Sequence, residues 1–175
     1  NCRGITLRVP LHGEIRLHLR REWCPLSEAY AADVAAAAPK QDSSVYRLEP
    51  GFLIQGRLSA PSVPKLRKST RATKVMERGE VGWAGGGSGP DFFIYLGDGP
   101  ASWLGVPHEG TVFAQVADEE SMEVANNISL VPVGPTKPGM MHIIKPAREM
   151  VPSAYRGGRG PLGHGRPPAL TVACT

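Results

Sequence analysis

The chain has 175 residues, a length that suits one domain. Its 20 lysines and arginines against 16 aspartates and glutamates give a net charge of +4, an excess too mild to favour nucleic acid as a partner. Hydrophobic residues make up 41% of the chain, which is enough for a core, and 21 glycines with 17 prolines favour turns and short strands over long helices. No apolar run approaches the roughly 20 residues of a membrane span.

The chain begins with a pattern typical of a β-hairpin. Residues 4–9 and 14–19 alternate apolar and polar side chains, and residues 10–13 between them carry a turn signal. The alternation predicts that one face of the second strand points to the core, namely Ile15, Leu17 and Leu19.

An alanine-rich helix is predicted next, over residues 25–38. Alanine is the best helix former, Ser27 suits the N-cap, and Pro39 stops the helix. A second helix is predicted over residues 118–128, where acidic residues in the first turn suit the helix dipole.

The remaining elements are strands and a tail. Residues 45–58 predict a strand pair interrupted at Pro50-Gly51. Further strands are predicted over residues 92–96, 111–116 and 140–144. From about residue 147 the sequence is rich in glycine, arginine and proline, so we expect residues 147–175 to be a tail that orders only against a partner.

Three cysteines are present, at Cys2, Cys24 and Cys174. They form no CxxC motif, and no histidine lies at metal-ligand spacing from them, so the sequence predicts no metal site and no cofactor. A Cys2–Cys24 disulfide is compatible with a hairpin of the first two strands, and free thiols are the alternative.

A basic segment, residues 57–80, admits two interpretations. It carries six cations between its ends, Lys65, Arg67, Lys68, Arg71, Lys74 and Arg78. It is either a solvated loop or a surface that docks on an acidic partner or anionic lipid. The glycine run at residues 85–89 does not predict a phosphate loop, because no Gly-Lys-Ser/Thr follows it.

The most informative segment is residues 46–56, which sets an arginine, a phenylalanine and a glutamine at fixed offsets: Arg47, Phe52 and Gln55. Residues 92–94 and 103–104 supply further apolar side chains. An arginine beside an apolar, aromatic-lined pocket suits a protein that holds a proline and acts on the peptide bond before it.

Residues 47–56 resemble the Arg-x-x-Pro-x-Phe-x-x-Gln-Gly pattern of the cyclophilins, the peptidyl-prolyl cis/trans isomerases. The resemblance covers residues 4–146, and it implies a mainly β fold: a closed eight-stranded antiparallel barrel capped by two α-helices. Closure of a barrel removes the sheet edges, which accounts for many short strands in one domain. Residues 147–175 would then be the tail.

The resemblance also implies roles for individual residues. Arg47 takes the place of the catalytic arginine, Gln55 would bind the substrate backbone, and Trp103 would line the edge of the site. His108 is the nearest counterpart of a histidine in the family's pattern. The proline pocket would be formed by Phe52, Leu53, Phe93 and Leu104. The implied partners are proline-containing segments of proteins.

Departures from the family's pattern leave two functions open. Asp91 stands where the family usually carries glutamine, and an acid there would neutralise Arg47 if the two paired. The asparagine usually found near residues 81–82 is missing, and Arg57 replaces a glycine. One function is isomerisation of X-Pro bonds, with an activity that these changes reduce. The alternative is a non-catalytic binding or structural subunit of a larger assembly, docked through the basic segment 57–80 and the tail.

The run of residues 82–93 also resembles divergent cyclophilin-like proteins of plants and green algae. Some of those are anchored in membranes of the secretory pathway. This second resemblance therefore implies localisation in the secretory pathway or in an organelle of a plant or green alga.

Overall fold

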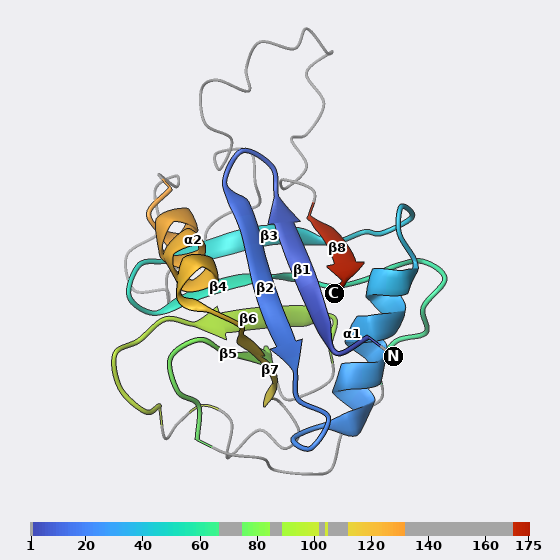
Figure 1. Cartoon of the computed structure of the whole chain (residues 1–175), viewed down its shortest axis with the longest axis horizontal. Helices are drawn as coiled ribbons and strands as arrows, with labels where there is room; N and C mark the ends of the chain where they lie inside the picture. Colours follow the sequence, from blue (N-terminus) through green and yellow to red (C-terminus); the bar gives the residue numbers. More distant parts are fainter. Residues whose placement is uncertain (1, 67–74, 85–88, 102–103, 105–111, 132–169) are drawn as a thin grey trace, which may run out of the picture.

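The computed structural model describes residues 2–66, 75–84, 89–101, 104, 112–131 and 170–175. These residues form eight strands and two helices (Figure 1). In chain order they are β1 Gly4–Val9, β2 Gly13–Leu19, α1 Pro25–Ala36, β3 Ser44–Glu49, β4 Leu53–Arg57, β5 Glu80–Trp83, β6 Asp91–Tyr95, β7 Val112–Val116, α2 Glu119–Ser129 and β8 Thr171–Cys174.

The strands form one sheet in the order β3-β4-β6-β5-β7-β2-β1-β8, and the pairings are antiparallel. The sheet curls so that β1 and β2 run across β3, β4 and β6 behind them (Figure 1). The prediction of a mainly β, eight-stranded antiparallel fold with two helices is confirmed, but the prediction of a closed barrel is wrong. Within the described residues β3 and β8 are edges, because no ladder of backbone hydrogen bonds joins them.

Side-chain and single backbone contacts span the open edge instead. The Leu170 amide donates to the Ser43 carbonyl at 2.8 Å, just before β8 and β3 begin. The Gln41 side chain donates from Nε2 to the Val172 carbonyl at 2.7 Å and accepts from the Val172 amide at 2.8 Å. The same Nε2 donates to the carbonyl of Val34 in α1 at 2.7 Å. One glutamine thus takes the place of a strand partner and ties β8 to α1.

The last strand corrects the expectation for the end of the chain. β8 lies inside the segment 147–175 that we expected to be a tail, yet it pairs with β1, and Val172 is fully buried. Residues 170–175 therefore belong to the folded domain, because Leu170 and Val172 supply apolar side chains to its core. Residues 147–169, and the strand predicted over residues 140–144, lie outside the described residues.

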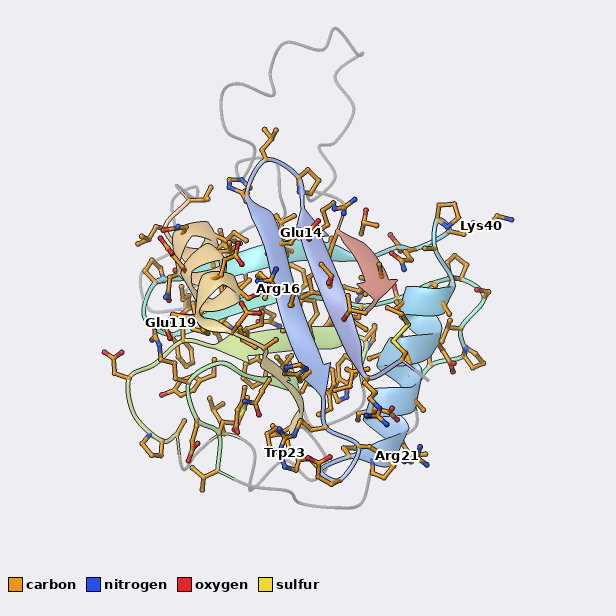
Figure 2. The ribbon with its side chains drawn as sticks, in the orientation of Figure 1. Glu14, Arg16, Arg21, Trp23, Lys40 and Glu119 are labelled. Atoms are coloured by element: carbon orange, nitrogen blue, oxygen red, sulfur yellow. A yellow bond between two sulfur atoms is a disulfide. The ribbon has the colours of Figure 1, made fainter. Side chains whose placement is uncertain are left out.

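A disulfide joins Cys2 and Cys174 across a sequence separation of 172 residues, with the two Cα atoms 5.5 Å apart (Figure 2). The Cys2–Cys24 pairing considered from the sequence is therefore wrong. The register of β1 and β8 places Cys174 opposite Ile5, close to Cys2 at the start of the chain. Cys24 is a buried free thiol, 2.9 Å from the hydroxyl of Ser27.

The concave face of the sheet encloses the main core. Ile15, Leu17 and Leu19 are buried there, as the alternation predicted. Trp83 stacks on Phe113 with ring centroids 4.2 Å apart and donates its indole N–H to Ser27 Oγ at 2.9 Å. Because α1 begins at Pro25, with Cys24 at the N-cap position, Ser27 is a buried core residue of the first turn. Its predicted N-cap role is wrong.

The second helix matches its prediction within one residue. Asp118 caps α2 by accepting from the Ser121 amide at 2.9 Å. Arg16, which lies on β2 beside α2 in Figure 2, pairs with Asp118 at 2.9 Å and also contacts Glu120. These contacts fasten the start of α2 to the outer face of the hairpin.

Candidate functional site

A tight turn between β3 and β4 positions the first site residues. The Phe52 amide donates to the Glu49 carbonyl at 3.0 Å, and Gly51 between them has a φ of 70°. Proline at the second position and a glycine with positive φ at the third are the features of a type II turn. The Pro-Gly of the motif thus has a physical reason, since Pro50 fixes φ and only glycine adopts the left-handed value without strain.

The glycine that ends the motif is explained by close packing. A Cβ atom on Gly56 would lie 2.2 Å from the Ser44 carbonyl oxygen of β3 and 2.9 Å from the Phe92 ring of β6. No side chain fits between these neighbours. Gly56 therefore lets β4 lie closely between β3 and β6, the three strands that carry the site.

Three of the predicted site residues lie in one row across these strands. Arg47 on β3 is the register partner of Gln55 on β4, and Gln55 is the register partner of Phe93 on β6. Residues opposite one another in a sheet point to the same face. The predicted arginine, glutamine and phenylalanine are thus neighbours on the face that points away from the main core.

An apolar cluster separate from the main core surrounds this row. It contains Leu53 and Phe93, which are 4% and 6% exposed, with Phe52 and Leu104 packed against them half-buried. The four residues predicted to form the proline pocket are therefore brought together. Strand alternation explains the separation, because Ile54, Phe92 and Ile94 point the other way, into the main core. The cluster also includes Met76, Tyr95, Ala101, Val112, Trp23 and Ala84.

Arg47 is held by two neighbours and is only 13% exposed. Its Nε donates to Glu49 Oε1 at 2.6 Å and its Nη1 donates to Gln55 Oε1 at 2.9 Å. Its Nη2 forms an ion-pair contact with the same Glu49 oxygen but makes no hydrogen bond within the described residues, although it is buried. Arg47 is thus fixed in place while one of its N–H groups still lacks a good acceptor.

Asp91 does not pair with Arg47, contrary to the pairing considered from the sequence. Arg57 Nε donates to Asp91 Oδ1 at 3.1 Å, and the two are register partners on β4 and β6. The hydrogen bond to Asp91 raises the pKa of Arg57 above its usual value. Arg57, and not Arg47, is therefore the partner of Asp91.

Two residues outside the predicted set of site residues also contact the row. Glu49 is the acid that Arg47 contacts, and the Tyr46 hydroxyl accepts from Gln55 Nε2 at 2.9 Å. Burial, and then the charge of Asp91, raise the pKa of Tyr46. The position of Glu49, two residues after Arg47 on the same strand face, was a signal for its role. No signal in the sequence indicates the position of the Tyr46 side chain, because that position depends on a β-bulge.

Two predicted site residues, Trp103 and His108, lie outside the described residues, as does the basic stretch 67–74. Where the chain is described, no three histidine, cysteine, aspartate or glutamate side chains are grouped as metal ligands would be. Neither of the two helices described here has the length and apolar character needed to span a membrane.

Comparison with known proteins agrees with the fold. Residues 5–148 match the family model described as cyclophilin type peptidyl-prolyl cis-trans isomerase/CLD. Since the match covers most of the chain, the protein belongs to the cyclophilin-type peptidyl-prolyl cis-trans isomerase family. Its function is accordingly isomerisation of the peptide bonds that precede proline, and its substrates are proline-containing peptides.

Two solved structures of a Cryptosporidium parvum cyclophilin-type isomerase share the fold. One, determined in the presence of the dipeptide Ala-Pro, has 18% sequence identity and a TM-score of 0.55, and the match covers 83% of this chain and 92% of that one. The other has 14% identity and a TM-score of 0.58, with 100% and 99% covered. A search of curated proteins gives no match. These comparisons support the family but not its plant and green-algal branch.

Proposed function

We propose that Arg47 is the catalytic residue of an X-Pro isomerase site on the outer face of β3, β4 and β6. The observation that carries the proposal is the register row in which Arg47, Gln55 and Phe93 are neighbours, next to an apolar cluster outside the main core. A guanidinium, an amide and an aromatic surface meet there, which suits a reaction that forms no covalent bond to the protein.

The chemistry needs only positioning and hydrogen bonding. Rotation about a peptide bond faces a barrier of about 18–20 kcal/mol, because the resonance of the amide must be broken. In the proposal, Phe52, Leu53, Phe93 and Leu104 hold the proline ring while Arg47 donates to the rotating amide. A donor that binds the twisted amide more strongly than the planar one lowers the barrier.

The state of Arg47 supports this role. Glu49 and Gln55 already hold the Arg47 side chain in one orientation, so it loses little conformational freedom when substrate binds. Its Nη2 lacks a hydrogen-bond acceptor within the described residues, and a substrate amide would supply one. Because Nη2 is buried, the side chains that cover it must shift slightly to admit the substrate. The similar Cryptosporidium parvum isomerase studied in the presence of Ala-Pro supports the same class of ligand.

The test is prolyl isomerisation of an Ala-Pro-Phe peptide, followed by protease coupling or NMR exchange. We expect Arg47→Ala to lower kcat/KM about 100-fold, the usual effect of removing one preorganised donor. Arg8→Ala is the matched control. Arg8 also lies on a strand and pairs with a glutamate, but it lies on β1 and its partner, Glu14, on β2, neither of which carries the proposed site. Its kcat/KM should equal that of the unmodified protein.

Failure of the unmodified, folded protein to accelerate isomerisation would overturn the proposal. The protein would then be a cyclophilin-like module that binds proline-containing segments without catalysis. Equal activity of Arg47→Ala and the unmodified protein would leave isomerisation in place but remove Arg47 from it.

A further inference from the structure

Tyr46 lies at a β-bulge next to the proposed catalytic arginine. The register of β3 and β4 passes from Val45 opposite Gly56 directly to Arg47 opposite Gln55, so Tyr46 is the additional residue of the bulge. A bulge interrupts the alternation of side chains and re-aims the additional one. The hydrogen bond from Gln55 Nε2 to the Tyr46 hydroxyl shows that this side chain reaches the face on which Arg47 lies.

The Tyr46 hydroxyl determines how the Gln55 amide is oriented. A guanidinium only donates hydrogen bonds, so the amide must turn its oxygen, Oε1, to Arg47. Its Nε2 then needs an acceptor on the other side, and the Tyr46 oxygen is that acceptor at 2.9 Å. The reversed amide would place two donors against each other at Arg47.

Burial, and then the negative charge of Asp91, raise the pKa of the Tyr46 phenol, and Arg57 donates to that carboxylate at 3.1 Å. Hydrogen bonds form a chain from Glu49 through Arg47 and Gln55 to Tyr46. Such a chain holds each of its members in one orientation.

We propose that Tyr46 is a positioning residue of the isomerase site, which acts through Gln55 to hold the guanidinium of Arg47 in its working orientation. The inference rests on the proposed function in assigning Arg47 to catalysis. It adds that the orientation of Arg47 depends on a hydroxyl group on the bulge, which acts through Gln55.

The first experiment compares Tyr46→Phe with Tyr30→Phe. Both changes remove one phenol hydroxyl and keep the ring, but the Tyr30 hydroxyl on α1 donates to the Leu58 carbonyl and makes no hydrogen bond to Arg47 or Gln55 within the described residues. We expect Tyr46→Phe to lower kcat/KM about three- to tenfold, the effect of one hydrogen bond on a barrier. Tyr30→Phe should leave kcat/KM unchanged.

A double-mutant cycle tests whether Tyr46 acts through Gln55. In a Gln55→Ala background the amide is gone, so Tyr46→Phe should cause no further loss of kcat/KM. If Tyr46→Phe lowers kcat/KM by the same factor in both backgrounds, Tyr46 does not act through Gln55 and the proposal is wrong.

An NMR measurement makes the test independent of catalysis. The resonances of the Arg47 Nε–H group and the Gln55 side-chain amide should shift in Tyr46→Phe but not in Tyr30→Phe. Shifts in a protein that proves inactive would support the positioning role and contradict only the proposed function. Unchanged resonances in Tyr46→Phe would overturn the positioning role, whatever the activity.

Discussion

At the scale of single residues, the charge around Arg47 depends on which acid pairs with which arginine. The sequence offers Arg47 two acids, Glu49 and Asp91, and the structure assigns them differently: Glu49 contacts Arg47, while Asp91 pairs with Arg57. Glu49 follows from strand alternation, since residues two apart share a face. Asp91 could not be assigned in advance, because its partner depends on the register between β4 and β6.

We predict that Glu49→Gln lowers the free energy of unfolding by about 1–3 kcal/mol, because it leaves a nearly buried guanidinium without its counter-ion. Both side chains of this pair are 13% exposed. Glu14→Gln is the control, since the Arg8–Glu14 pair is 67% and 42% exposed and should contribute less than about 1 kcal/mol. Urea unfolding measures both. Equal losses in the two variants would contradict the prediction.

At the scale of secondary-structure elements, local signals predicted most of the fold. The hairpin, the strand pair around Pro50-Gly51 and the helix capped by Asp118 agree with periodicity, turn chemistry and charge. What these signals missed depends on neighbours. The bulge at Tyr46 is invisible in the sequence, and Ser27 resembles a helix cap although it contacts Trp83 in the core.

The start of α2 carries a pH-dependent contact. The hydrogen bond from Arg16, together with the cap, lowers the pKa of Asp118 below that of an ordinary aspartate. A group whose pKa is lower in the folded state stabilises the protein above its unfolded pKa, about 3.9, and loses that contribution as the pH falls further. We therefore predict that Asp118→Asn has a lower Tm than the unmodified protein at pH 7, and that the difference shrinks towards pH 2.

Thermal unfolding from pH 7 to pH 2 measures this difference. Asp98→Asn is the control, because Asp98 pairs with Arg78 at 3.3 Å but its side chain is fully exposed. That variant should keep the Tm of the unmodified protein throughout. A Tm difference for Asp118→Asn that does not change with pH would contradict the prediction. High salt should also reduce the difference, since the Arg16–Asp118 pair lies at the surface.

At the scale of the whole molecule, the two ends of the chain are fastened together. β8 lies beside β1, and the Cys2–Cys174 disulfide joins them, while Gln41 and Ser43 hold β8 against the start of β3. These contacts hold the open half-barrel in its curled shape. The site lies on β3, the strand at the other edge, so the fastening also supports the strand that carries Arg47.

We predict that reducing the disulfide lowers the free energy of unfolding by about 2–5 kcal/mol, since a link between the two ends restricts the unfolded chain most. Denaturant unfolding with and without reductant measures the loss, and Cys2→Ser without reductant should match it. Alkylation of the unreduced, denatured protein should label one thiol, that of Cys24. Three labelled thiols, with no effect of reductant on stability, would contradict the prediction.

The sequence by itself determined the class of fold, most element positions and the candidate residues of the site, because periodicity, turn chemistry and the spacing from Arg47 to Gly56 are local properties. Only the tertiary structure decided that the barrel is open, that Cys174 is the partner of Cys2, that Arg57 is the partner of Asp91, and that Tyr46 contacts Gln55. Each of these depends on residues far apart in the chain or on a bulge in strand register. Such pairings are set by the packing of the whole sheet, and no local pattern records them.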